Sequence, residues 1–322
     1  MIHVSDLKKT FTSYERGSSF GEALLSLFIR KKKIIEAVKG ISFDIEEGEL
    51  VGFLGPNGAG KSTTIKILTG ILHPTSGTVD IMGFTPWKER KKYVQNIGAV
   101  FGQKSQLLWD IPPLDAFYLN QAIYRIPDSE FKKAVNDMVE MLDLKDLVKK
   151  PTRQLSLGER MKCEFIMAML HKPRIVFLDE PTIGLDVIAK GKIRDFILEQ
   201  NKRGTTFILT THDLEDVEQL AKRVIVINHG EIVFDNSMDK LKQHLGEKRT
   251  VHITAKEKIN LENRDGIVVR KQLSDYDIEV VIDLSVVKLN EFIQKINEES
   301  EIRDIAIEGP ELEQIIMKLY SV

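Results

Sequence analysis

The stretch that decides the fold is residues 50–62, Leu50-Val51-Gly52-Phe53-Leu54 followed by Gly55-Pro56-Asn57-Gly58-Ala59-Gly60-Lys61-Ser62. The apolar run predicts a buried strand, and the apolar residues after Lys61 recur at helical spacing. Between them, Gly-x-x-x-x-Gly-Lys-Ser is typical of a phosphate-binding loop whose backbone N–H groups face phosphate oxygens. We expect Lys61 to reach the phosphates and the Ser62 hydroxyl to hold Mg²⁺. Thr63, the next residue, is expected to contact the nucleotide as well.

A second apolar run, residues 175–178, ends in two carboxylates, Asp179 and Glu180. Ligands of doubly wound sheets bind at the carboxyl ends of the strands. Asp179 is therefore expected to support Mg²⁺, and Glu180 to orient and deprotonate an attacking water. By itself such a run is better explained as a solvated strand end. Together with the phosphate loop, it predicts hydrolysis of a nucleoside triphosphate.

Strand-like and helical segments alternate along the first three quarters of the chain. We expect helices after the phosphate loop, through most of 115–150, and near 191–201, and strands at 2–7, 41–46, 50–54, 77–83, 96–101, 175–178 and 206–210. This alternation predicts an α/β fold with a mostly parallel sheet. Near Gly246 the composition changes, and residues 251–320 follow a β-β-β-α-β-α pattern. The predicted domains are thus residues 1–245 and a small α+β domain, residues 246–322.

The composition limits the classes of partner. The chain has 322 residues, 46 of them Lys or Arg and 48 Asp or Glu, for a net charge of −2. It therefore lacks the overall positive charge typical of nucleic-acid-binding proteins, and no nucleic acid is expected as a partner. One cysteine, Cys163, permits no intramolecular disulfide. The histidines show no ligand spacing, so we predict no transition-metal site.

Taken together, the motifs resemble those of ABC ATPases over residues 1–245. The resemblance rests on a signature-like sequence at residues 155–160 (Leu155-Ser156-Leu157-Gly158-Glu159-Arg160), a D-loop region at 181–186, a histidine switch at 210–213 and a Q-loop residue, Gln103. It implies the P-loop NTPase fold of that family, with a RecA-like core, an antiparallel β subdomain and a helical subdomain at about 104–170.

The resemblance also implies a head-to-tail dimer, of two copies or of this chain and a paralogue, with two ATP molecules between the subunits. Residues Lys61, Ser62, Asp179, Glu180 and His212 of one subunit would face Ser156 and Gly158 of the other. The Ser hydroxyl, the Gly N–H and a helix start form a second anion site. Further roles implied by the family are the γ-phosphate contact of His212, a relay by Asp186, a Mg²⁺ contact by Gln103 and adenine stacking by Phe11, with Tyr14 as the alternative.

Three departures from the family pattern affect these expectations. Leu157 replaces the first glycine of the signature, although Ser156 and Gly158 remain. Glu159 replaces the usual glutamine and is expected to point away from the phosphates or to pair with a cation. The spacing after the strand is one residue longer than usual, so Gln106 is an alternative to Gln103. Asp115 favours Gln103, because it then occupies the position of the family's acidic residue.

Residues 101–106 and 109–113 resemble a bacterial subgroup that serves ABC-2-type permeases, near drug and viologen exporters. This implies a peripheral subunit on the cytoplasmic face of the cell membrane. The insert at 17–33 is predicted to be an amphipathic helix, either near the membrane or packed on the protein. Four apolar residues are expected either to line a permease-binding groove or to lie in the core: Trp109, Ile111, Leu114 and Phe117.

Two functions other than that of an exporter subunit fit parts of the sequence. A soluble ABC ATPase acting on ribosomes or nucleic acid is the main alternative. Such proteins carry two cassettes in one chain or long coiled coils, and this sequence has a single cassette and no sustained heptads. A small-molecule P-loop kinase would need neither the signature nor the histidine switch.

Overall fold

The computed structural model describes residues 1–15, 31–102, 104–211, 213–243, 248–308 and 319–320. The chain divides into two compact units, Met1–Asp235 and Asn236–Val322. In the described ranges, the first unit has two sheets and the second has one, and each unit has its own apolar core. Among the described residues, no helix combines the length and the apolar character needed to cross a bilayer.

The central sheet of the first unit has the order β5-β6-β7-β3-β8-β9. Its strands are β3 (Leu50–Leu54), β5 (Ile97–Phe101), β6 (Ile175–Asp179), β7 (Thr206–Thr210), β8 (Arg223–Asn228) and β9 (Glu231–Ser237). Pairing is parallel from β5 through β6, β7 and β3 to β8. All residues of β3 and β7 are buried, which explains why both strands are rich in apolar residues. β8 and β9 were not predicted from the sequence.

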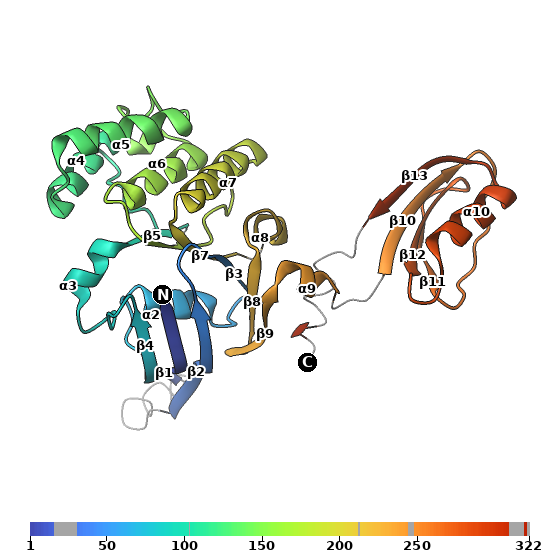
Figure 1. Ribbon diagram of the computed structural model, residues 1–322, viewed down its shortest axis with the longest axis horizontal. Coiled ribbons are helices and arrows are strands. Elements are labelled where there is room, and N and C mark those ends of the chain that lie inside the picture. The colour runs from blue at the N-terminus through green and yellow to red at the C-terminus, as the bar shows by residue number, and fades with distance from the viewer. Residues whose placement is uncertain (16–30, 103, 212, 244–247, 309–318, 321–322) are drawn as a thin grey trace, which may run out of the picture. The chain divides into compact units, whose positions relative to one another are not determined.

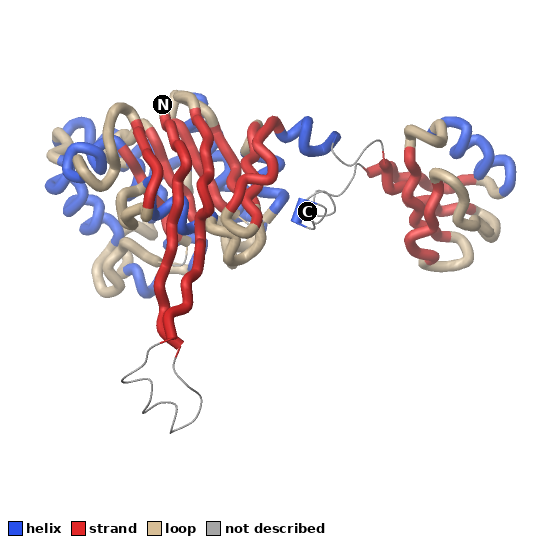
Figure 2. Tube along the Cα trace, turned by 90° about the horizontal axis from the view of Figure 1, so that it is seen from below, coloured by secondary structure: helices blue, strands red, loops and turns tan. Residues whose placement is uncertain are grey.

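A three-stranded antiparallel sheet, β2-β1-β4, completes the first unit. It consists of β1 (Ile2–Glu15), β2 (Lys31–Ile45) and β4 (Ser76–Ile81). Beyond Lys8, β1 pairs only with β2, so these two strands continue as a ribbon past the end of β4 (Figure 2). The sequence predicted only their inner halves, because outside the core their side chains no longer alternate between buried and exposed.

The helices of the first unit flank the central sheet or gather beside it (Figure 1). They are α2 (Lys61–Leu68), α3 (Arg90–Tyr93), α4 (Pro113–Tyr124), α5 (Asp128–Met141), α6 (Leu157–Met169), α7 (Val187–Lys202) and α8 (Leu214–Leu220), with 3₁₀ turns η1 (Val94–Asn96) and η2 (Thr152–Gln154). The region 115–150 contains two helices, because Arg125 has a positive φ and Pro127 follows it. α6 contacts α4, α5, α7 and β5, and so joins the helical group to the sheet.

The second unit begins with the end of β9 and α9 (Met238–Gln243) and contains one four-stranded sheet of order β11-β12-β10-β13. Its remaining elements are β10 (Lys248–Ala255), β11 (Ile267–Gln272), β12 (Asp277–Asp283), α10 (Leu289–Glu299) and β13 (Ile302–Glu308). One sheet face and α10 enclose a core of aliphatic residues around Phe292. The β-β-β-α-β order expected from the sequence is observed. Most of the last expected helix lies outside the described residues, as does most of the 17–33 insert.

Candidate functional site

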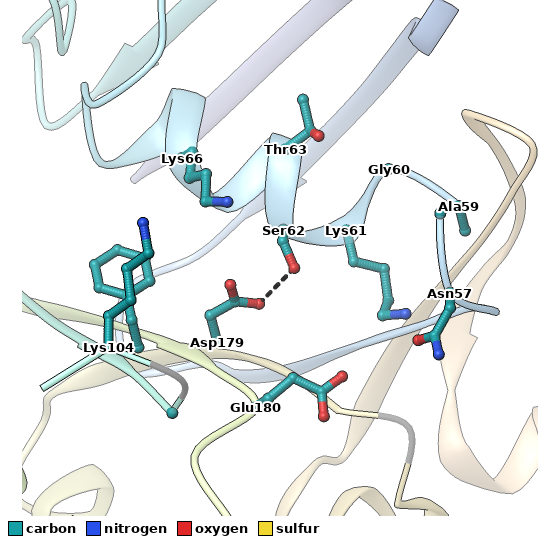
Figure 3. A pocket seen from close by; sticks show the side chains of 13 residues that line it. Asn57, Ala59, Gly60, Lys61, Ser62, Thr63, Lys66, Lys104, Asp179 and Glu180 are labelled. Atoms are coloured by element: carbon teal, nitrogen blue, oxygen red, sulfur yellow. Dashed lines mark hydrogen bonds between the residues drawn. The ribbon is translucent and has the colours of Figure 1, made fainter. Parts of the chain in front are cut away.

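A pocket of about 250 Å³ lies at the carboxyl ends of the central strands, between the loop after β3 and the ends of β5 and β6 (Figure 3). Thirteen residues line it: Asn57, Gly58, Ala59, Gly60, Lys61, Ser62, Thr63, Lys66, Phe101, Gly102, Lys104, Asp179 and Glu180. Two segments more than 110 residues apart in the sequence, the glycine-rich loop and the carboxylate pair, therefore meet in one place.

The glycine-rich loop is held between β2 and β8, and its glycines are required there. Gly60 precedes α2 with φ of 110°, and a Cβ at this position would lie 2.4 Å from the Ala37 carbonyl oxygen of β2. A Cβ on Gly55 would lie 2.2 Å from the Ile227 carbonyl oxygen of β8. Only glycine lets the backbone come this close, so the loop turns tightly into the N-terminus of α2. That N-terminus presents its N–H groups and dipole to an anion.

Lys61 lies at the bottom of the pocket with only 6% of its surface exposed. Its Nζ donates to the carbonyl oxygens of Gly55, at 2.6 Å, and Pro56, at 3.1 Å. Burial lowers the pKa of Lys61, and the carboxylates of Glu180 and Asp179 counteract that shift. An ammonium held among loop carbonyls and facing two carboxylates is placed to bind phosphate oxygens.

Asp179 connects the two halves of the pocket. Its Oδ1 accepts hydrogen bonds from Ser62 Oγ at 2.8 Å (Figure 3) and from Thr210 Oγ1 at 2.5 Å. Asp179 and Thr210 are register partners of β6 and β7, so the sheet itself fixes this contact. A carboxylate and a hydroxyl oxygen within hydrogen-bond distance form the hard-oxygen donor set that Mg²⁺ prefers. The residues therefore fit Mg²⁺.

Glu180 follows Asp179 in the left-handed conformation, with φ of 55°. A non-glycine residue in this region costs about 1–2 kcal/mol, and the surrounding structure enforces it. The Glu180 N–H donates to the Thr210 carbonyl at 2.9 Å, and its own carbonyl packs against Gly102. The turn directs the Glu180 side chain into the pocket beside Lys61 (Figure 3).

The loops after β6 and β7 are joined by a buried network on Asp216 of α8, a residue with no exposed surface. Asp216 accepts hydrogen bonds from Thr182 Oγ1 and, at 2.6 Å, from Nε of Arg194. His212 itself lies outside the described residues. Its neighbours are fixed: Thr211 is buried and accepts a hydrogen bond from the N–H of Asp213, which caps α8.

The residues of the signature-like sequence do not line the pocket. Ser156 caps α6, and a capping box forms in which Ser156 Oγ accepts from the Glu159 N–H at 3.2 Å and Glu159 Oε2 accepts from the Ser156 N–H at 2.8 Å. Glu159 was expected to avoid the phosphates or to pair with a cation; it instead satisfies a helix N-terminus. Gly158 packs against α7, where a Cβ would lie 2.9 Å from that of Ala189.

Gln103 lies outside the described residues, but both of its neighbours, Gly102 and Lys104, line the pocket. The alternative, Gln106, does not. Its Nε2 donates to the Ala99 carbonyl at 2.6 Å, and it lines a different cavity with Asn120 and Tyr124. Gln103 as the Q-loop residue therefore stays a prediction.

Two other predicted residues lie away from the pocket. Asp186 caps α7 by accepting from the Ala189 N–H at 2.8 Å. Phe11 lies on the outer part of β1, 37% exposed, with Lys9 Nζ 5.2 Å from its ring centre. The side chain of Tyr14 is not described, so the choice of adenine platform stays open.

Sequence reasoning missed five residues of the site, among them Phe101 and Gly102 at the end of β5. Lys66 and Lys104 line the pocket, and Thr210 holds Asp179. Lys66 could have been found from its spacing, since it lies one helical turn after Ser62. Thr210 could have been found by aligning the carboxyl ends of β6 and β7, where it pairs with Asp179. No sequence signal marked Lys104.

Comparison with known proteins identifies the family. A family model described as ABC transporter matches residues 38–183. The ABC transporter ATP-binding protein NatA of Bacillus subtilis (strain 168) is 31% identical over 214 residues, 66% of this chain and 87% of the relative. The linearmycin resistance ATP-binding protein LnrL of the same organism is 29% identical over 293 residues, 88% of this chain and 93% of the relative.

A similar solved structure also belongs to an ATP-binding protein. An ATP-binding cassette, described as a dimer in a post-hydrolysis state bound to ADP and Pi, is 26% identical with a TM-score of 0.62. The similarity covers 74% of this chain and 99% of that chain. The ABC ATPase fold predicted from the motifs is confirmed. The chain belongs to the ABC transporter ATP-binding proteins and is an ATP-binding, ATP-hydrolysing subunit of that family.

Proposed function

We propose that this chain is the ATPase subunit of an exporter, and that it forms a head-to-tail dimer that drives a separate ABC-2-type membrane permease. The observation that carries the dimer is the division of the site. The phosphate loop, Asp179 and Glu180 share one pocket, whereas Ser156 and Gly158, at the N-terminus of α6, lie outside it. A second anion-binding element placed outside the pocket would reach the γ-phosphate from another subunit. The partner is a second copy or a paralogous ATPase.

Each site residue predicted from the sequence then has a defined task. The N–H groups of residues 55–63 cradle the phosphates, and Lys61 exchanges its carbonyl partners for β- and γ-phosphate oxygens. Glu180 orients the attacking water and accepts its proton. His212 contacts the γ-phosphate, and Asp186, which caps α7, relays between the two sites. Phe11, or Tyr14, stacks on adenine.

Ser62 and Asp179 would hold Mg²⁺, with Gln103 as a further ligand. The bound ion would neutralise charge on the β- and γ-phosphates. The support for this assignment is the contact between Ser62 Oγ and Asp179 Oδ1 together with the oxygen chemistry of both groups.

Export is supported by the relative LnrL, whose name assigns it to linearmycin resistance.

The similarity to LnrL covers 88% of this chain. Residues 1–245 make up only about three quarters of the 322 residues, so the similarity extends into the second unit. We therefore assign residues 1–245 to the ATPase domain and 246–322 to an accessory domain shared with such resistance ATPases.

The permease-binding surface would include the loop before α4 and one side of that helix. Four large apolar side chains there are at least 48% exposed: Leu108, Trp109, Leu119 and Tyr118. Phe117, by contrast, is fully buried and belongs to the core. Docking through this surface would place the subunit at the cytoplasmic face of the cell membrane.

Affinity purification of the tagged full chain from detergent-solubilised membranes tests the proposal. An ABC-2-type integral membrane protein should co-purify, and Leu119→Asp should reduce its recovery. Lys132→Asp, on an exposed position of α5, is the matched control and should have no effect. Recovery of ribosomal proteins, or of a membrane protein of another class, would contradict the exporter assignment.

A further inference from the structure

Glu164 is a buried acid that the ATPase chemistry described above does not use. It lies on α6, eight residues after Ser156, and only 4% of it is exposed. One of its oxygens, Oε1, accepts from Ser105 Oγ at 2.5 Å, from the Gln106 N–H at 2.8 Å and from the Leu107 N–H at 3.3 Å. A single carboxylate oxygen thus binds three successive residues of another segment.

That segment leads directly out of the phosphate pocket. Gly102 and Lys104 line the pocket, and their N–H groups donate to the carbonyls of Asp179 at 2.8 Å and Phe101 at 2.9 Å. Ser105 follows immediately. The three bonds to Glu164 therefore lie between the pocket wall and the helix whose first residues carry the signature-like sequence.

Further contacts join the same two segments along their length. The N–H groups of Arg153 and Thr152 donate to the carbonyls of Trp109, at 3.0 Å, and Ile111, at 3.1 Å. The Arg160 guanidinium lies 5.9 Å from the Trp109 ring centre. Residues 105–111 therefore run along residues 152–164, and Glu164 is the contact nearest to the pocket.

The fold alone gives no reason for a carboxylate at this position. Burial raises the pKa of Glu164 despite the hydrogen bonds from Ser105, Gln106 and Leu107. Its second oxygen, Oε2, is buried and has no hydrogen-bond partner among the described residues. An apolar side chain would fill the same space without this desolvation cost. Only a side chain that accepts hydrogen bonds can attach the 105–107 loop to α6.

The geometry points to Glu164 as a positioning residue that fastens loop 105–107 to α6, so that a nucleotide-dependent shift at the pocket wall moves the Ser156 end of the helix. This inference rests on the proposed function, in which Ser156 and Gly158 act on ATP held by a second subunit. Glu164 does not touch the reacting atoms. It acts through the loop and the helix that it joins.

The experiment compares four single variants of the full chain and one double variant, Glu164→Ala combined with Ser105→Ala. Glu164→Ala removes the acceptor, Glu164→Gln retains one sp² oxygen, and Ser105→Ala removes one donor. Phe165→Leu is the matched control: Phe165 is fully buried on the same helix with its ring against Phe196, and the three loop hydrogen bonds are made by Glu164. Each variant is assayed for ATPase kcat and KM, for thermal stability, and for amide hydrogen exchange at residues 104–107.

We expect Glu164→Ala to lower kcat by between about 10-fold and 100-fold, the size of effect that a misplacement near 1 Å produces, with little change in KM. Hydrogen exchange at the Gln106 and Leu107 amides should accelerate. In Glu164→Gln, both kcat and the exchange rates should return most of the way to their wild-type values. Adding Ser105→Ala to Glu164→Ala should have no further effect, because the shared bond is already gone. Phe165→Leu should be less stable than the wild type, but its kcat and its amide exchange at residues 104–107 should stay close to the wild-type values.

Two outcomes overturn the inference. One is wild-type kcat and wild-type loop exchange in Glu164→Ala. The other is a loss of kcat in Phe165→Leu equal to that of Glu164→Ala at the same loss of stability, which would make the effect a general one. If instead the unmodified chain neither hydrolyses ATP nor dimerises with it, the proposed function fails, while the exchange data still report whether Glu164 holds the loop.

Discussion

Gly102→Ala offers a direct test of the Glu180 assignment, because it perturbs that residue and leaves every other side chain of the pocket unchanged. A Cβ at position 102 would lie 2.0 Å from the Glu180 carbonyl oxygen and 3.2 Å from Ile183 Cγ2. Gly102 does not have a positive φ, so alanine is compatible with the backbone conformation. The predicted effect is therefore steric and localised at Glu180.

The size of the effect follows from this contact. Ordinary van der Waals contacts begin near 3.4 Å, so the two groups must separate by about 1.4 Å. Glu180 has little room to move, since its N–H is held by the Thr210 carbonyl and its φ is already in the left-handed region. A misplacement near 1 Å at a reacting group costs roughly 100-fold. We therefore expect kcat to fall about 100-fold.

Steady-state ATPase kinetics and calorimetric ATP titration measure the two halves of this prediction. The Kd for ATP should change little, because neither clashing atom belongs to the phosphate loop. Gly191→Ala is the control: a Cβ there meets nothing within 4 Å, and alanine within α7 should preserve turnover and stabilise the helix slightly. Normal kcat in Gly102→Ala would refute the role of Glu180 as the base, and equal losses in both variants would refute the steric argument.

Three further predictions concern single side chains. Lys61→Ala should lower turnover by on the order of 10²-fold or more, since it removes the buried cation from the phosphate site; wild-type hydrolysis would exclude that role. Glu180→Gln should bind ATP and elute as a dimer with it in size-exclusion chromatography; a monomer with unchanged turnover would exclude Glu180 as the base. Because burial raises the folded-state pKa of Glu164 above its ordinary 4.5, wild-type stability should fall as pH rises through the window just above 4.5. Thermal unfolding should show Glu164→Gln gaining relative stability through that window, and a pH-independent difference would contradict it.

The sequence predicted the parallel sheet well where strands are buried on both faces. β3, β6 and β7 are apolar runs bounded by turn residues, and their carboxyl ends carry the pocket residues. The phosphate loop was predictable for a similar reason, since its glycines are fixed by close approach to neighbouring strands. The positions of Lys61, Ser62, Asp179 and Glu180 around one pocket agree with the roles expected of them, which stay predictions until they are tested by mutation.

Other features depend on contacts that a single sequence does not reveal. The outer halves of β1 and β2 are held by pairing with each other rather than by burial, so no apolar alternation marks them. The departure at Glu159 could be noticed in the sequence, but its partner in the capping box became clear only from the geometry of α6. Glu164 gave no signal, because one acid within an apolar helix face is indistinguishable from an exposed one until its three donors are known.

The hydrogen bonds around the pocket also bear on how strongly one subunit can hold ATP. Lys61 is bonded to two loop carbonyls, and Ser62 and Thr210 are bonded to Asp179. Binding of ATP exchanges such bonds instead of adding them, and each exchange contributes only about 0.5–1.5 kcal/mol net. The larger contribution must come from the N–H groups and dipole at the start of α2. A second helix start, that of α6 from another subunit, would add a comparable contribution only when two chains meet. ATP would then be bound more strongly by the dimer than by either subunit, which is the condition under which nucleotide binding drives association.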